Sequence, residues 1–274
     1  LTDYATARSL LEDRLAVATD LGIESLIGSA SGSLGILAWL QGDHAAAEPL
    51  YEVCLKIHEQ SKNMSAVANT TWALGTIAAE RGNYERAENL LKHSSSMAKE
   101  IGDTYVASGS LRDLGVTLCY KGEYREAIGY IEQGIALAQE AQFRVGVNWA
   151  MSALGFARLG QGDYTGAEEL FRESLRLAKT IDKHKIPDSL EGLAEVECVL
   201  AEGGKAQARL QRAATLLGAA EAIRGAMKSK IIPVRAPSRG RLVTEVRSRL
   251  GPETYEQAYR LGEAMSFEEV LSLA

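Results

Sequence analysis

The sequence predicts an all-α solenoid built from helix pairs. The prediction rests on three features that recur every 40 residues. A Leu-Gly pair occurs four times in this register, a second glycine follows seven residues after each pair, and an alanine follows five residues later. The Leu-Gly pairs begin at residues 34, 74, 114 and 154, the second glycines are residues 42, 82, 122 and 162, and the alanines are residues 47, 87, 127 and 167. Because the three features keep strict register four times, composition alone does not account for them.

Each repeat predicts two helices. The first helix carries the Leu-Gly pair, and the second glycine with the Asp, Asn or Glu after it ends this helix and usually caps the next. In the second helix, apolar or small residues lie 3, 4, 7, 8, 10 and 11 positions after the alanine, which is one face of a helix. In the fourth repeat these are Leu170, Phe171, Ser174, Leu175, Leu177 and Ala178. The first helices are expected at 28–40, 64–79, 104–120 and 145–159.

A glycine inside each first helix indicates a close contact between the paired helices. Glycine costs a helix interior roughly 1 kcal/mol relative to alanine, so its recurrence needs a packing reason. We expect the second helix to approach too closely at Gly115 and its equivalents for a side chain, with the repeat alanine as the facing small residue. Pro49 lies inside a second helix, where it predicts a kink.

The pattern extends beyond the four clear repeats. Tyr4 and Ala7 lie 40 residues before His44 and Ala47, so the chain is expected to open inside a repeat, with further repeats upstream. A weaker fifth unit follows Pro187.

The C-terminal part predicts a different organisation. A linker with two prolines is followed by three short helices expected near 238–250, 252–263 and 266–274, the last with a capping box of Ser266 and Glu269. We therefore divide the chain into a solenoid of about five and a half repeats over 1–227 and a linker with a helical cap over 228–274.

The repeat resembles the tetratricopeptide (TPR) pattern. The shared features are the Leu-Gly pair, the small alanine, an apolar residue four later and a small residue seven later. The usual TPR period is about 34 residues, so this chain is similar to the variant with longer helices. The resemblance covers residue 1 to about 225 and implies a right-handed solenoid whose first helices line a concave surface.

The tail adds a second resemblance. Residues 216–227 and 241–274 are similar to the end of the TPR region in large bacterial ATP-dependent regulators, including the LuxR-type transcriptional regulators. This resemblance implies a sensing and scaffolding segment, with an ATPase and a DNA-reading domain outside the chain. The alternative is a stand-alone TPR scaffold without a transcriptional role.

No catalytic constellation is visible, so we expect no enzyme, cofactor or metal site. The four histidines lack metal-ligand spacing and are expected to be solvated or capping: His44, His58, His93 and His184. Gly203-Gly204-Lys205 lacks the upstream glycine of a phosphate-binding loop, so we expect no ATP binding. The three cysteines are expected to be buried and inert: Cys54, Cys119 and Cys198. Scattered cysteines and no visible secretory leader favour the cytoplasm.

The expected inner surface carries few charges and several aromatic residues. The four first helices hold three charged residues, Arg112, Asp113 and Arg158, so this surface should be nearly neutral. Aromatic and polar residues occupy positions that face the groove in TPRs: Trp39, Asn69, Trp72, Arg112, Trp149 and Phe156. They predict either a ligand groove for a peptide, protein or small inducer, or packing between repeats.

Residues 204–250 hold eleven basic and two acidic residues, in a chain whose net charge is −6. This basic segment predicts either docking on the chain's own acidic solenoid or a neighbouring ATPase, or contact with nucleic-acid phosphates. Base-specific readout is not supported, because no aromatic residue or recognition helix is evident there. No apolar run approaches the roughly 20 residues that span a bilayer, so no membrane partner is expected.

Overall fold

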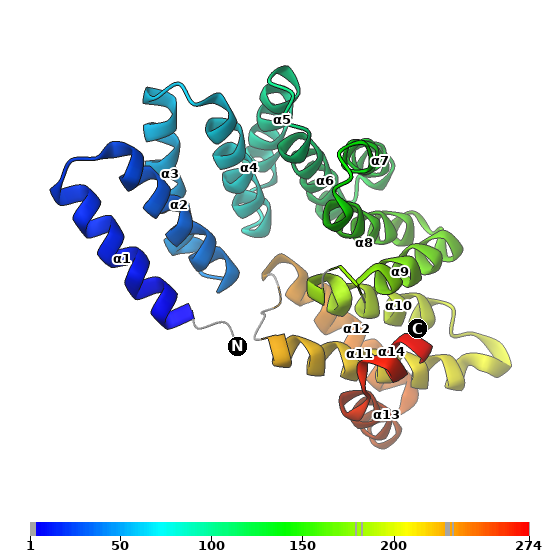
Figure 1. The fold of residues 1–274 in the computed structure, drawn as a ribbon. Coiled ribbons are helices and arrows are strands. Elements are labelled where there is room, and N and C mark those ends of the chain that lie inside the picture. The colour runs from blue at the N-terminus through cyan, green and yellow to red at the C-terminus, as the bar shows by residue number, and fades with distance from the viewer. Residues whose placement is uncertain (1–3, 179, 182, 228–230, 232, 274) are drawn as a thin grey trace.

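The structure is a computed structural model that describes residues 4–273 except 179, 182, 228–230 and 232. The described chain forms α-helices and short 3₁₀ turns, and no strand occurs among these residues. Successive helix pairs stack into an arc, with α4, α6 and α8 on the inside and α5 and α7 on the outside (Figure 1). The predicted all-α solenoid is therefore confirmed.

The helices follow the predicted repeat closely. The solenoid helices are α1 (Tyr4–Asp20), α2 (Glu24–Leu40), α3 (His44–Gln60), α4 (Met64–Glu80), α5 (Tyr84–Glu100), α6 (Thr104–Lys121), α7 (Tyr124–Glu140), α8 (Arg144–Gln161), α9 (Tyr164–Ala178), α10 (Ile186–Val199) and α11 (Ala206–Met227). The C-terminal helices are α12 (Ala236–Leu250), α13 (Pro252–Ala264) and α14 (Phe267–Leu273), after the 3₁₀ turn η3 (Pro233–Arg235). α1 occupies the second-helix position of its repeat, as expected.

The turns between helices explain these boundaries. Gly122 has φ +83° at the end of α6, a left-handed conformation that glycine adopts without strain. Asp43 accepts a hydrogen bond from the Ala46 N–H at 3.0 Å and so caps α3. Ser266 and Glu269 form the predicted capping box, with the Ser266 N–H donating to Glu269 Oε2 at 2.7 Å. α3 continues through Pro49, which lies in its second turn.

The repeat glycines lie where paired helices come close, although their main partner differs from the expected one. A Cβ built at Gly115 would lie 2.4 Å from Ile131 Cγ1 and 2.8 Å from the Ala127 carbonyl oxygen. At the equivalent glycines of the other repeats the closest atoms belong to Tyr51, Leu91 and Phe171. Each of these residues stands four positions after the repeat alanine. The glycine therefore makes room mainly for a large side chain, not for the alanine.

Gly115→Leu is expected to lower the free energy of unfolding by roughly 1–3 kcal/mol or more, because the new side chain has no space between α6 and α7. Urea unfolding followed by circular dichroism measures this loss. Gly129→Leu on α7 is the control, since no side chain and no atom of another helix lies within 4 Å of a Cβ there, apart from its two chain neighbours. Equal stability of both variants would contradict the close-contact explanation.

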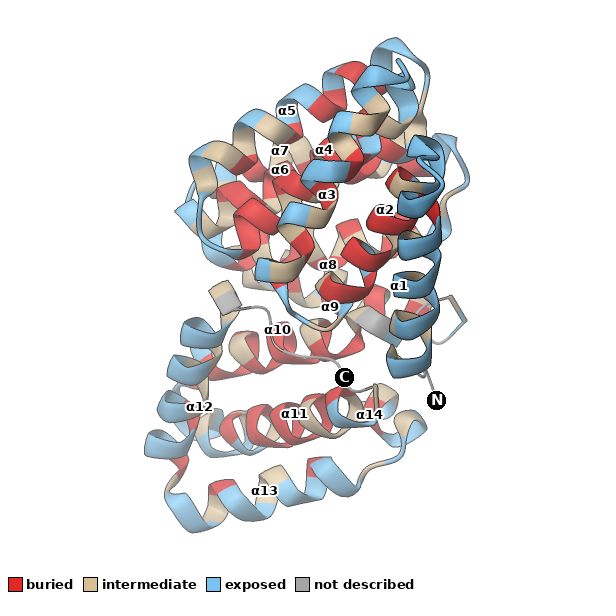
Figure 2. Cartoon of the chain, turned by 90° about the vertical axis from the view of Figure 1, so that its left-hand side faces the viewer, coloured by how far each residue is buried: buried red, intermediate tan, exposed pale blue. Residues whose placement is uncertain are grey.

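The C-terminal helices share a core with the last repeats. α11 lies between α10 and α13 and is largely buried (Figure 2). One continuous cluster of buried side chains extends from Leu159 through Phe171 and Leu217 to Val270.

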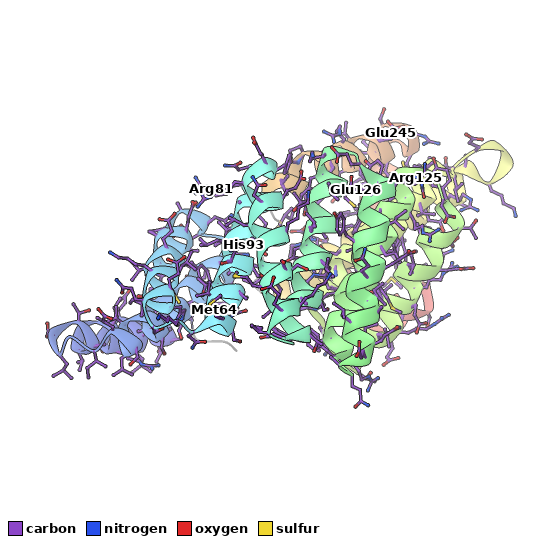
Figure 3. All side chains as sticks on the ribbon, turned by 90° about the horizontal axis from the view of Figure 1, so that it is seen from above. Met64, Arg81, His93, Arg125, Glu126 and Glu245 are labelled. Atoms are coloured by element: carbon purple, nitrogen blue, oxygen red, sulfur yellow. The ribbon has the colours of Figure 1, made fainter. Side chains whose placement is uncertain are left out.

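The outer surface of the solenoid carries charged and polar side chains. His93 on α5 and Arg125 and Glu126 on α7 are exposed there (Figure 3). Among the described helices, none is both long and apolar enough to cross a bilayer.

Candidate ligand groove on the concave surface

Two tryptophans and an arginine from three successive first helices form a stack inside the arc. The Arg112 guanidinium carbon on α6 lies 5.6 Å from the centroid of the Trp72 ring on α4 and 5.2 Å from that of Trp149 on α8. Both distances suit a cation–π interaction. Arg112 is 8% exposed, whereas both tryptophans are half-buried. The structure thus brings together three of the six residues that the sequence singled out.

Asp113 holds this stack in place. Its carboxylate accepts hydrogen bonds from Trp72 Nε1 at 2.7 Å, Thr76 Oγ1 at 2.9 Å and Arg112 Nε at 2.8 Å. Burial by itself raises the pKa of the Asp113 carboxyl, but the adjacent Arg112 charge and these hydrogen bonds outweigh it and lower the pKa below its usual value. The carboxylate is therefore ionised and neutralises the enclosed guanidinium.

Further aromatic and polar groups border the stack. Tyr105 meets Trp72 edge to face at a centroid distance of 5.6 Å and is 47% exposed. Asn69 lies one turn before Trp72 on α4 and is exposed. The surface therefore offers aromatic faces beside an amide that can donate and accept hydrogen bonds.

Phe156 lies two turns after Trp149 on α8 and is covered by a residue of the linker. Its ring packs against Phe171 at a centroid distance of 4.9 Å, and the Arg235 guanidinium carbon lies 4.1 Å from the Phe156 centroid. Phe156 remains half-buried. It therefore joins the core to the concave surface and does not join the tryptophan stack.

α10, the first helix of the fifth repeat, adds charged residues to this surface. α10 carries four acidic residues, Asp188, Glu191, Glu195 and Glu197. Arg235 pairs with Asp188 at 3.1 Å and lies 3.7 Å from Glu191. α10 thus adds acidic residues that the count over the four earlier helices did not include, and basic side chains pair with Asp188, Glu191 and Glu197.

Trp39 belongs to a separate cluster. Its Nε1 donates to Glu80 Oε2 at 2.7 Å, and His44 Nε2 lies 2.9 Å from the same oxygen. His44 is only 8% exposed and its imidazole faces a side-chain carboxylate, so the expectation of a solvated or capping role is wrong. The cause is the terminal residue of α4, Glu80, which gives both nitrogens a buried acceptor.

The other histidines differ among themselves. His93 is exposed, as expected, while His58 is half-buried, and burial lowers the pKa of its imidazole. The His184 side chain lies outside the described residues.

Much of the basic segment is paired within the chain. Arg209 and Arg212 both contact Glu197, and Arg239 contacts Glu191 and Glu221. The Arg249 guanidinium donates to the backbone carbonyls of residues 198 and 201. Lys228 and Lys230 lie outside the described residues. The described arginines thus support docking on the chain's own solenoid over contact with phosphates.

Cys54 and Cys198 are buried as expected, whereas Cys119 is half-buried. Burial raises the pKa of all three thiols, that of Cys119 to about 12, which favours the protonated form over the reactive thiolate. Within the described residues, no cluster of His, Cys, Asp and Glu could hold a metal ion.

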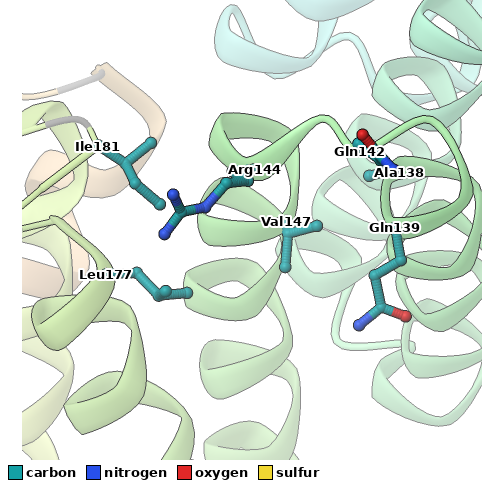
Figure 4. A pocket seen from close by; sticks show the side chains of 7 residues that line it. All are labelled: Ala138, Gln139, Gln142, Arg144, Val147, Leu177 and Ile181. Atoms are coloured by element: carbon teal, nitrogen blue, oxygen red, sulfur yellow. The ribbon is translucent and has the colours of Figure 1, made fainter.

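A shallow pocket lies at the edge of the solenoid, where α7 turns into α8 (Figure 4). Its lining residues are Ala138, Gln139, Gln142, Arg144, Val147, Leu177 and Ile181. It contains none of the residues that the sequence singled out for the groove.

The model of the MalT-like TPR region matches residues 30–237. The chain belongs to the MalT-like TPR family. This match begins inside α2 and ends at the start of α12, so it includes η3 and most of the basic segment. A comparison with curated protein sequences finds no match.

Solved structures with the same fold extend this finding. The apo form of RapI aligns with a TM-score of 0.67 at 12% identity, covering 100% of this chain and 94% of that one. A Rap protein complexed with Competence and Sporulation Factor gives 0.59 at 13% identity, covering 90% and 74%. BtubC from P. vanneervenii gives 0.60 at 16% identity, covering 84% and 94%. At these identities the likeness establishes the fold of the MalT-like TPR chain and nothing finer.

Proposed function

We propose that this chain is a non-catalytic sensing segment of a bacterial regulator, which captures a peptide or protein ligand on its concave surface. The stack of Trp72, Arg112 and Trp149 carries the proposal, because tryptophan and arginine are enriched among binding hot spots, and both tryptophans keep exposed area that a ligand can bury. The MalT-like TPR family and the Rap protein structure with a bound factor support it.

The mechanism follows from where the stack comes from. Each member belongs to a different repeat, so a ligand that contacts both tryptophans spans α4 to α8 and favours one curvature of the arc. A ligand shifts the balance between two arrangements by its difference in affinity for them. In this proposal the change in curvature alters how the chain holds an ATPase and an output domain of the full-length protein. The protein acts in the cytoplasm.

The test uses a phage-displayed peptide library selected on the wild-type chain. Trp149→Ala is expected to weaken binding of the selected peptides at least roughly thirtyfold, because truncating an interface anchor typically costs about 2 kcal/mol or more. Fluorescence anisotropy with labelled peptides measures the affinity, and circular dichroism checks the fold.

Arg125→Ala is the control, because this residue is exposed on the outer helix α7. Packing alone predicts the opposite result for Trp149→Ala: a lower melting temperature, with affinity following only the folded fraction. A lower melting temperature without a specific loss of affinity, or an equal loss of affinity in Trp149→Ala and Arg125→Ala, would contradict ligand binding in the groove.

A further inference from the structure

The Arg235 guanidinium occupies a three-sided site on the concave surface. The Phe156 ring lies under it, its centroid 4.1 Å from the guanidinium carbon. Asp188 Oδ1 lies 3.1 Å from Nη1, and Glu191 Oε2 lies 3.7 Å from Nη2. One aromatic face and two carboxylates at the edge match a planar, delocalised cation with several donors.

The carboxylate oxygens that Arg235 uses are those that other cations leave open. Lys185 Nζ lies 3.1 Å from the other Asp188 oxygen, Oδ2. Arg224 Nη2 lies 2.8 Å from the other Glu191 oxygen, Oε1. Departure of Arg235 would therefore leave neither carboxylate without a counterion. The site can exchange one guanidinium for another without exposing an unpaired buried charge.

The site and its occupant come from different parts of the chain. The aromatic and acidic residues lie on α8 and α10 of the solenoid, whereas Arg235 ends η3, which joins the α11 region to α12. η3 also contacts α4, and the segment lies within the arc (Figure 1). Lys185 connects this site to the tryptophan stack, since its Nζ lies 5.9 Å from the Trp149 centroid. A segment of the chain thus occupies the concave surface beside the candidate groove.

We propose that residues 233–239 act as an internal ligand, and that the external partner is a peptide segment whose arginine replaces Arg235 on Phe156, Asp188 and Glu191. This inference rests on the proposed function and specifies its ligand class. Lysine is a poor substitute, because an ammonium group is compact and cannot stack as a plane while contacting two carboxylates. The Phe156 face and the open oxygens of Asp188 and Glu191 select a cationic side chain over an acidic one at this position.

Exchange couples binding to the C-terminal helices. Arg239, in the first turn of α12, pairs with Glu191 at 2.7 Å, so α12 is held to α10 through the same carboxylate. When an external arginine takes the place of Arg235, η3 loses its contact with Phe156 on α8, and Arg239 becomes the remaining ionic link between this part of the chain and α10. The partner therefore loosens the segment that leads into the C-terminal helices.

The first experiment uses a fluorescent peptide with the sequence of residues 233–241, added to the wild-type chain, to Arg235→Ala and to Arg241→Ala. Arg241 is the matched control, because it is an exposed arginine of α12 that lies just outside residues 233–239. We expect the peptide to bind Arg235→Ala at least ten times more tightly than the other two chains, since only that site is vacant. A peptide carrying Arg235→Lys should bind Arg235→Ala at least ten times more weakly. Equal affinity for the three chains, or for the two peptides, would overturn the proposal.

A second measurement uses the wild-type chain, so that a folding defect in Arg235→Ala cannot account for the result. Saturating peptide 233–241 is expected to speed hydrogen exchange in α12, whereas the Arg235→Lys peptide should not. Unchanged exchange with the arginine peptide would show that no replacement occurs.

The two proposals can fail separately. If library peptides need Trp149 for binding but do not compete with peptide 233–241, the proposal of a ligand groove stands and that of arginine exchange is wrong. If peptide 233–241 binds Arg235→Ala but no library peptide depends on Trp149, the proposal of a guanidinium site stands and that of a ligand groove is wrong.

Discussion

Gly262→Ala is expected to separate α13 from α11 and to cost about 3 kcal/mol of unfolding free energy, the upper end of the usual overpacking range. A Cβ at residue 262 would lie 1.9 Å from the Thr215 carbonyl oxygen, and one at Gly218 would lie 2.0 Å from the Tyr259 carbonyl oxygen. The obstacles are backbone atoms on both sides, so no rotamer change relieves them. The two helix backbones touch, and only glycine fits at this crossing.

Thermal and urea unfolding measure this loss, and hydrogen exchange in α13 shows where it occurs. Gly225→Ala on α11 is the control, because no atom of another helix lies within 4 Å of a Cβ there and alanine favours the helix by up to about 1 kcal/mol. A Gly262→Ala chain as stable as Gly225→Ala would mean that α13 does not pack on α11 in this way.

The repeat explains why so much of the fold could be predicted from the sequence. Gly115 and its equivalents recur in register, and each recurrence reports the same helix contact. Gly218 and Gly262 allow an even closer contact between two helices, but this contact occurs at only one place in the chain. No periodic signal therefore distinguishes them from other glycines. The C-terminal helices were predicted from prolines and caps, but how they pack depends on contacts that local sequence does not specify.

The residues of the candidate groove were predicted only in part. The TPR resemblance selects repeat positions that face one side of the solenoid, and three of the six residues selected in this way form the stack, namely Trp72, Arg112 and Trp149. Asp113 was counted as a charge but not assigned to the stack, because its link to Trp72 depends on the lateral distance between α4 and α6. Arg235 lies 79 residues after Phe156, and no pattern in the sequence joins the two.

Long-range pairing also explains the error at His44. A histidine on a charged second helix has no local signal for burial. Its acceptor, Glu80, lies at the end of the next first helix, one residue beyond the expected span of 64–79.

Asp113→Asn is expected to cost about 3 kcal/mol, because removing one partner of a buried ion pair leaves the other charge uncompensated. Arg112, at 8% exposed, would lose its counterion, and Trp72 would lose a charged acceptor. Urea unfolding measures the loss against Asp13→Asn, which neutralises an exposed aspartate of α1. Adding Arg112→Met to Asp113→Asn should recover part of the stability, since no unpaired charge then remains.

The pH dependence of stability tests whether the Asp113 charge itself is responsible. Burial opposes ionisation of the carboxyl, but Arg112 and the three hydrogen bonds prevail, so its pKa in the folded chain is below the usual value. A lowered folded pKa stabilises the fold fully above the unfolded pKa of about 4, and this contribution is lost as pH falls through the folded pKa. The stability gap between the wild-type chain and Asp113→Asn should therefore be constant at neutral pH and narrow below about pH 4. A gap that persists unchanged at low pH would assign the loss to packing, and the tryptophan stack would then not depend on an ionised Asp113.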